Sequence, residues 1–324
     1  MMERVSAMAQ ATLRRGALVM LGIAMLMGPV SEARGQSPMS WSEFRALPSV
    51  EADQRVEYGP GPHGWGELYL PEGGGPHPVA LVVHGGCWQS MADVGYMSRF
   101  SRFLAEAGWA VWAPEFRRID QSDSDWPAIL EDVAASADHL RVMAGEFDLD
   151  LDRVVSLGHS SGGHLALWLA GRSALPPDEA SGFALRGDAP LPIRAVVGLA
   201  AIADLEEFDD RPERGCGRDI VSRLVAGNPE GLDERLRLTS PESALPLGVP
   251  QLLLTGGLDG TVPTAHGAAW VRAATEAGDV AELLDVPGAG HFELVAPWDP
   301  RFASMWPTVQ AFLDVIGRDG ARVP

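Results

Sequence analysis

The chain has 324 residues, of which 46% are hydrophobic and 21% are charged, so it is long and apolar enough to bury a sizeable core. That composition excludes a disordered chain. The formal net charge of −19 excludes nucleic acid as a partner, because proteins that bind nucleic acid usually present a basic surface to the phosphates.

The N-terminal stretch has the pattern of a secretory signal peptide. Arg4, Arg14 and Arg15 precede an apolar run over residues 16–30, and the small residues around Ala33 offer a cleavage site. The apolar run is short for a helix that crosses a bilayer. We therefore predict a signal peptide over residues 1–35, an exported protein (periplasmic or extracellular) and no stable membrane span after cleavage. An uncleaved membrane anchor is the alternative.

Two cysteines, Cys87 and Cys216, are present. In an oxidising compartment they can pair, but the sequence alone does not bring their Cα atoms within bridging distance. We interpret them as two buried thiols, the commoner state of a small apolar side chain. A disulfide between them remains the alternative.

Residues 36–324 are interpreted as one domain in which strands alternate with helices. A continuous apolar run at 79–83 is typical of a central strand that is covered on both faces. This alternation predicts an α/β fold with a mostly parallel, doubly covered sheet. The helices expected in the first half lie at 41–44, 97–107 and 126–143, and the strands at 55–58, 66–70, 79–83 and 110–113.

The strand at 79–83 ends in the segment His84-Gly85-Gly86-Cys87-Trp88. A glycine-rich loop after a buried strand lets backbone N–H groups turn toward a developing oxyanion. We predict Gly85, Gly86 and Cys87 as such donors, with the N–H of Ser161 completing the oxyanion hole. His84 is expected to anchor the loop by hydrogen bonds. A plain turn is the alternative.

The segment Gly158-His159-Ser160-Ser161-Gly162 follows an apolar run at 154–157 and leads into a helical segment at 165–170. Strand, sharp turn and helix form the context of a G-x-S-x-G nucleophile elbow. Ser160 is therefore predicted to be a nucleophile. Glycine is needed at 158 and 162 because a Cβ atom there would collide with neighbouring backbone. The flanking histidines, His159 and His164, point elsewhere on such a turn and are not expected to act as the base.

The second half continues the alternation but is interrupted by an insertion at about 204–247. An acidic run and a helical piece at 220–225 predict a small cap over the carboxyl edge of the sheet, where ligands bind in open α/β folds. A surface excursion without substrate contact is the alternative. Strands are expected at 194–199, 249–255 and 281–286, and helices at 264–277 and 302–316.

Two further polar residues follow predicted strands. Asp259 comes after the strand at 249–255, and His291 lies on a glycine-rich loop after the last strand. The order Ser160, Asp259, His291 is that of an α/β-hydrolase triad, in which a histidine takes the serine proton and a carboxylate orients the histidine. Asp204 is the rival acid. Asp285 is less suitable because it lies within a strand.

A resemblance to a known family is carried by four segments, at 84–88, 114–118, 158–166 and 290–292. Together they are similar to the α/β-hydrolase branch of kynurenine formamidase (arylformamidase), the feruloyl- and acetyl-ester hydrolases similar to it, and prolyl-oligopeptidase-like hydrolases. The resemblance spans about 56–316 and implies the fold and the triad more specifically than the substrate. Ser161 stands where relatives usually have alanine, and Phe116 where they often have tyrosine. Export disfavours the formamidase.

The resulting prediction is a serine hydrolase of carboxylic esters, a secreted carboxylesterase that works through an acyl-enzyme on a small-molecule ester or amide. An arylformamidase-type amide hydrolase and a prolyl-oligopeptidase-like peptidase are the alternatives, and a non-catalytic binding protein is a remote one. No metal and no cofactor are expected. The natural substrate, its acyl size and the oligomeric state do not follow from the sequence. The residues expected to line the substrate pocket are Trp88, Met91, Trp126 and Trp298.

Overall fold

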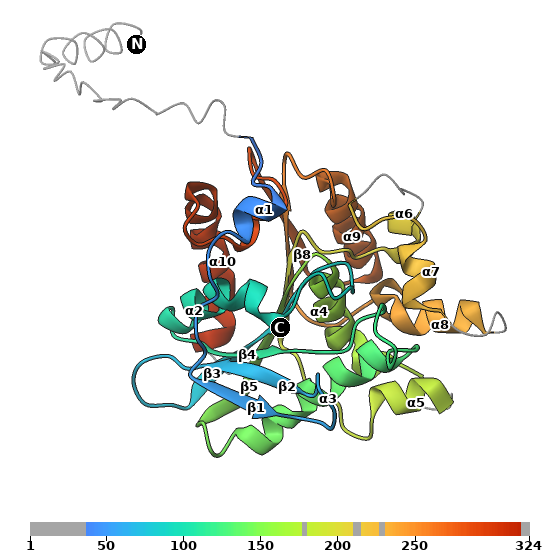
Figure 1. Ribbon diagram of the computed structural model, residues 1–324, viewed down its shortest axis with the longest axis horizontal. Coiled ribbons are helices and arrows are strands. Elements are labelled where there is room, and N and C mark those ends of the chain that lie inside the picture. The colour runs from blue at the N-terminus through green and yellow to red at the C-terminus, as the bar shows by residue number, and fades with distance from the viewer. Residues whose placement is uncertain (1–36, 177–179, 210–214, 227–230, 319–324) are drawn as a thin grey trace, which may run out of the picture. The chain divides into compact units, whose positions relative to one another are not determined.

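Eight strands form one sheet in the computed structural model, which describes residues 37–176, 180–209, 215–226 and 231–318 (Figure 1). The spatial order is β1-β2-β4-β3-β5-β6-β7-β8. The first two pairings, β1 with β2 and β2 with β4, are antiparallel, and all the others are parallel. The predicted α/β class and mostly parallel sheet are confirmed. The strands are β1 (Gln54–Glu57), β2 (Trp65–Tyr69), β3 (His77–Val83), β4 (Ala110–Pro114), β5 (Leu149–His159), β6 (Ala195–Leu199), β7 (Gln251–Gly256) and β8 (Ala281–Val286).

The central strands bring their carboxyl ends to one edge of the sheet. Val83 of β3 pairs with Gly158 of β5, and His159 pairs with Leu199 of β6. Parallel strands in this register place the loops that follow them side by side. The loops carrying residues 84–88, Ser160, Asp259 and His291 therefore all leave the sheet at this edge.

Helices cover both faces of the sheet. In Figure 1, α2 and α10 lie on one side, and α3, α4 and α9 lie on the other. On the first side, the Phe103 ring packs edge-on against Phe302 and Trp306 at 5.1 and 4.7 Å between centroids. The helices are α1 (Trp41–Phe44), α2 (Ser98–Glu106), α3 (Ala128–Met143), α4 (Ser161–Gly171), α5 (Ala180–Arg186), α6 (Leu205–Asp209), α7 (Ile220–Leu224), α8 (Leu232–Thr239), α9 (Thr264–Ala277) and α10 (Pro300–Arg318), with 3-10 turns η1 (Val94–Met97), η2 (Arg172–Ala174), η3 (Pro241–Ala244) and η4 (Glu293–Val295).

The described residues of the stretch at 204–247 form three short helices, α6, α7 and α8, where one helical piece was expected. Its end is anchored to the helix that follows the predicted elbow: Trp168 Nε1 donates to the carbonyl of Leu238 at 2.8 Å, and His164 Nε2 donates to that of Thr239 at 2.9 Å. The insertion is therefore hydrogen-bonded to α4 at the end of α8. Its predicted role as a substrate-shaping cap stays a prediction.

The predicted signal peptide at 1–35 lies outside the described residues, so cleavage and export stay predictions. No helix in the described ranges has the length and apolar character needed to cross a membrane.

Candidate active site

Ser160 occupies a sharp turn between β5 and α4. Its backbone has φ 58° and ψ −122°, a region that costs an L-residue about 1–3 kcal/mol and that the surrounding structure must enforce. Two glycines make the turn possible. A Cβ on Gly158 would lie 2.1 Å from the carbonyl oxygen of Gly162, and a Cβ on Gly162 would lie 2.2 Å from that of Val83. The local geometry is thus that of a nucleophile elbow.

Asp259 and His291 meet on the neighbouring loops. His291 Nδ1 donates to Asp259 Oδ2 at 2.7 Å, and both side chains are largely buried. The other carboxylate oxygen, Oδ1, accepts the backbone N–H groups of Thr261 at 2.7 Å and Val262 at 2.9 Å. Both oxygens of the carboxylate are therefore fixed, and His291 is held with its proton on Nδ1.

The Asp259 carboxyl is kept ionised by these contacts. Burial by itself raises its pKa, but the charge and hydrogen bond of His291, together with the two backbone amides, outweigh burial and hold the pKa below its ordinary value. A charged carboxylate at neutral pH is what stabilises an imidazolium during proton transfer.

The rival acids have other partners. Asp204 Oδ1 accepts the backbone N–H of Glu207 at 2.9 Å and so caps α6. Asp285 Oδ1 accepts the hydroxyls of Thr255 and Thr264 at 3.1 and 2.8 Å. The structure brings Asp259, and neither of these two, to His291.

Ser160 Oγ makes no hydrogen bond to His291 among the bonds found in the described ranges. In free enzymes, catalytic hydrogen bonds are often long and tighten only when substrate is bound. The structure therefore shows the hydrogen bond between His291 and Asp259 and places Ser160 on the elbow. A hydrogen bond between Ser160 Oγ and His291 would form when substrate is bound.

The loop after β3 has an unusual backbone. Gly86, Cys87 and Trp88 all have positive φ, at 111°, 55° and 56°. Successive residues of this kind form a concave row of N–H groups that suits an anion. Within the described part of the chain, the amides of Gly86, Cys87 and Ser161 donate to no protein acceptor.

Gly85 lies beside the hydroxyl of Tyr96: a Cβ on Gly85 would be 3.0 Å from that oxygen. The four predicted donors of the oxyanion hole stay candidates: Gly85, Gly86, Cys87 and Ser161.

Buried polar contacts hold this loop. His84 Nδ1 donates to the carbonyl of Gly85 at 2.8 Å, the anchoring role expected for His84. The Trp88 amide donates to Ser161 Oγ at 3.3 Å, and Trp88 Nε1 donates to His164 Nδ1 at 3.2 Å. Burial lowers the pKa of both His84 and His164 to about 4, so both rings are neutral at physiological pH. Neither ring is free to act as the base.

Comparison with known proteins identifies the family. The BD-FAE family model matches residues 67–273, most of the described domain. This chain belongs to the BD-FAE family. The α/β-hydrolase resemblance is thereby confirmed, while the particular likeness to kynurenine formamidase stays a prediction.

Relatives of this BD-FAE protein include esterases. The "Esterase LipC" of Mycobacterium tuberculosis is 30% identical over 226 residues, which cover 68% of this chain and 54% of LipC. The chain thus spans about half the length of this curated relative. Two solved structures share the fold. A truncated carbohydrate esterase from gut microbiota has a TM-score of 0.66 at 20% identity and covers 88% of this chain and 100% of its own. Thermogutta terrifontis esterase 2, phosphorylated by paraoxon, has a TM-score of 0.62 at 19% identity and covers 83% and 96%.

The two cysteines of this BD-FAE protein form a disulfide, so the interpretation as two free thiols is wrong. The Cα atoms of Cys87 and Cys216 lie 5.4 Å apart although 129 positions separate them in sequence. Gln89 Nε2 also donates to the carbonyl of Cys216 at 3.4 Å. The insertion is therefore covalently joined to the loop that carries the candidate oxyanion donors.

Removal of both sulfurs is expected to weaken the fold and the site together. In a Cys87→Ala/Cys216→Ala variant, loss of a bridge that closes so long a loop should lower the free energy of unfolding by about 2–5 kcal/mol. Ester turnover should also fall, because Cys87 loses the partner that holds its left-handed backbone. Denaturant unfolding and kcat, each with and without reductant, check this. The disulfide assignment would be contradicted if the free energy of unfolding and kcat were unchanged in the variant, or if reductant lowered either of them further in the variant.

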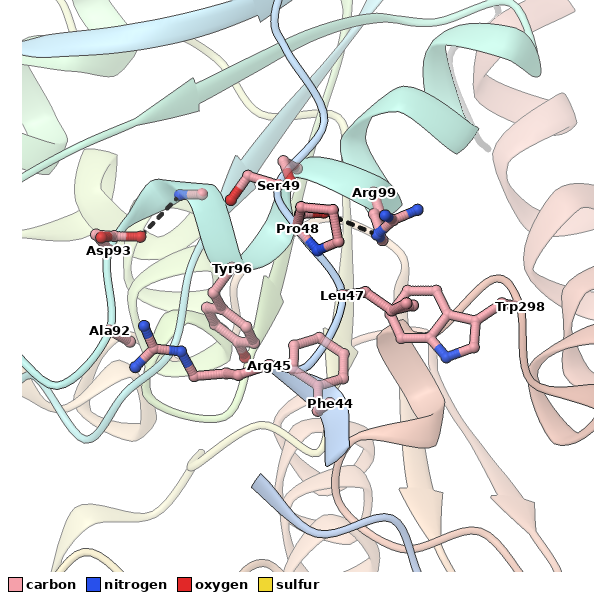
Figure 2. A pocket seen from close by; sticks show the side chains of 12 residues that line it. Phe44, Arg45, Leu47, Pro48, Ser49, Ala92, Asp93, Tyr96, Arg99 and Trp298 are labelled. Carbon is pink, nitrogen blue, oxygen red and sulfur yellow. Dashed lines mark hydrogen bonds between the residues drawn. The ribbon is translucent and has the colours of Figure 1, made fainter. Parts of the chain in front are cut away.

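Of the four residues predicted to line the substrate pocket, Trp298 lines a cavity of about 230 Å³ with Phe44 and Tyr96, between Arg45 and Arg99 (Figure 2). Trp88, Met91 and Trp126 are not among the residues that line this cavity. Trp88 is 1% exposed and belongs to the core. Met91 is exposed, and its carbonyl accepts from Arg45 at 3.2 Å. Trp126 Nε1 donates to Thr239 Oγ1 at 2.9 Å.

Proposed function

We propose that this protein is a serine hydrolase that cleaves carboxylic esters through an acyl-enzyme. The observation that carries the proposal is the 2.7 Å hydrogen bond from His291 to Asp259 at the sheet edge from which the strained Ser160 elbow also emerges. Membership of the BD-FAE family and the esterases among its relatives support the same reaction.

In the proposed first half-reaction, Ser160 Oγ attacks the ester carbonyl carbon while His291 Nε2 takes the hydroxyl proton. The carbonyl π bond becomes an oxyanion, which accepts hydrogen bonds from the amides of Ser161, Gly86 and Cys87. The oxyanion then reforms the carbonyl, the C–O bond to the alcohol breaks, and His291 returns the proton to the leaving oxygen. Ser160 remains esterified.

In the second half-reaction, a water molecule takes the place of the alcohol. His291 accepts a proton from water, the resulting hydroxide equivalent attacks the acyl carbon, and the Ser160 Oγ–C bond breaks with return of the proton to the serine. The carboxylic acid is released. Asp259 stays ionised throughout and stabilises the imidazolium twice in each cycle.

A substrate panel tests the reaction class. We expect initial rates on a short-chain aryl ester to exceed those on N-formylkynurenine and on a short peptide, because alkoxide and phenoxide leaving groups need less protonation than an amine. Purified mature protein is assayed on all three at equal concentration. Preference for N-formylkynurenine would move the protein to the formamidases, and preference for the peptide to the peptidases. Absence of measurable hydrolysis of all three substrates would overturn the proposal.

A further inference from the structure

His159 lies between the nucleophile and the loop of His291. It precedes Ser160 on the elbow, and its side chain is fully buried. Its Nε2 is 2.8 Å from the backbone carbonyl oxygen of His291, and the two imidazole centroids are 4.6 Å apart. The elbow and the loop that carries His291 are thus joined by one side chain, which the chemistry proposed above leaves without a role.

The backbone carbonyl of His291 determines which nitrogen of His159 carries the proton. A carbonyl oxygen only accepts hydrogen bonds, so Nε2 must be the protonated nitrogen that donates to His291. Nδ1 is then an acceptor, and its partner is the hydroxyl of Tyr96, which must donate. That hydroxyl oxygen also lies beside Gly85, 3.0 Å from where a Cβ on Gly85 would be.

Each hydrogen bond in this network has a fixed donor and a fixed acceptor. The Tyr96 hydroxyl donates to His159 Nδ1, and His159 Nε2 donates to the carbonyl of His291. The Tyr96 hydroxyl oxygen also packs against Gly85. The contacts link three loops: the glycine-rich loop after β3, the elbow after β5 and the histidine loop after β8. A fully satisfied buried network of this kind holds its members in one arrangement.

Burial keeps the network in one protonation state. It lowers the pKa of His159 to about 3, with the neighbouring His291 acting in the same direction, and it raises the pKa of Tyr96 well above its ordinary value. His159 is therefore neutral whenever His291 works. A charged His159 at this distance would oppose the imidazolium that His291 must form.

We propose that His159 and Tyr96 are positioning residues, which set the backbone of His291 and the glycine-rich loop relative to Ser160. The inference rests on the proposed function, because it concerns the alignment of the same three groups. Loss of alignment by about 1 Å costs on the order of 100-fold in rate, so the network has a kinetic consequence that packing alone would not give.

Three substitutions separate hydrogen bonding from packing. His159→Leu removes both nitrogens and should lower kcat by about 10- to 100-fold with KM changed less than about threefold. His159→Gln keeps an N–H donor near the position of Nε2 and should recover most of the loss. Tyr96→Phe keeps the ring, which packs on Phe44 at 5.4 Å, and removes only the hydroxyl; its kcat should fall between the two.

A matched control is Tyr69→Phe. Tyr69 is also buried, but its hydroxyl bonds to Glu67 on β2 at 2.5 Å. Removal of the Tyr69 hydroxyl should leave kcat unchanged. A loss equal to that of Tyr96→Phe would show that a buried hydroxyl matters only for folding, and would overturn the positioning role.

A second readout does not need turnover. The proton on His291 Nδ1, shared with Asp259, gives a far-downfield NMR signal when the pair is fixed. We expect a sharp signal in the wild-type protein and in His159→Gln, and a broadened or absent signal in His159→Leu. If His159→Leu does not fold, Tyr96→Phe decides both measurements.

The outcomes distinguish this inference from the proposed function. Dependence of the NMR signal on His159 in a protein that hydrolyses no ester would defeat the proposed function and leave the positioning role standing. Ester turnover that is insensitive to His159→Leu and Tyr96→Phe, with an unchanged signal, would overturn the positioning role alone.

Discussion

Replacing Ser160 with alanine is expected to abolish ester hydrolysis almost completely. The loss in kcat should be about 10⁶-fold, the size seen when the nucleophile of such a triad is removed. The neighbouring Ser161 hydroxyl accepts the Trp88 amide and does not stand at the strained position of the turn. The residual rate would come from the oxyanion donors and substrate binding. Stability should change little, since Ser160 Oγ makes no hydrogen bond in the described ranges and alanine keeps the Cβ.

Paraoxon labelling gives this expectation a stoichiometric check. Attack by Ser160 Oγ forms an O–P bond and expels p-nitrophenolate, so intact-mass measurement should show one diethyl phosphoryl group on the wild-type protein and none on Ser160→Ala. The exposed Ser304→Ala on α10 serves as the control and should label and turn over normally. A Ser160→Ala protein that retains kcat within tenfold of wild type, or still takes up the label, would show that the nucleophile lies elsewhere.

Much of the fold could be predicted because its signals are local. Helix α9, Thr264–Ala277, was placed to the residue: Pro263 precedes its first turn, and Gly278 ends it with φ 104°. Strand β8, Ala281–Val286, follows a short turn and was also placed correctly. Buried parallel strands such as β3 appear as apolar runs because both faces are covered.

The insertion shows why local signals fail. Helix α8, Leu232–Thr239, has only eight residues and fully buries only Leu238 and Thr239, so its apolar pattern is too short to identify a helix reliably from the sequence. The disulfide was missed for a different reason. Whether Cys87 reaches Cys216 depends on how the insertion folds back over the sheet edge, and no spacing in the sequence carries that information.

The candidate site shows the same difference between local sequence signals and contacts that depend on the tertiary fold. Ser160, Asp259 and His291 were found because each follows a strand in a recognisable order, which fixes the edge of the sheet on which they emerge. The proximity of Gly85 to Tyr96, a residue outside the motif, could not be predicted from the sequence. His159 was not expected to be the base, and its contact with the His291 carbonyl joins residues that are 132 positions apart, so nothing in the sequence indicated it.

Replacing Asp259 with asparagine should cost about 10⁴-fold in kcat with KM nearly unchanged. The direction of the asparagine amide is dictated by the structure. Thr261 and Val262 aim two backbone N–H groups at Oδ1, at 2.7 and 2.9 Å, so the amide oxygen must stay on that side. The amide NH₂ then faces His291 Nδ1, which has to become an acceptor. The ring proton moves to Nε2, where it blocks removal of the Ser160 proton.

A matched variant exists for this test. Asp204→Asn makes the same chemical change in the rival acid, and asparagine caps a helix about as well as aspartate, so α6 and kcat should both be preserved. The far-downfield signal of the His291 Nδ1 proton should vanish in Asp259→Asn and persist in Asp204→Asn. A large kcat loss in Asp204→Asn with a near-normal rate in Asp259→Asn would reverse the assignment. The 2.7 Å contact between His291 and Asp259 would then be a structural pair, and the acid of the triad would have to reach His291 from the insertion.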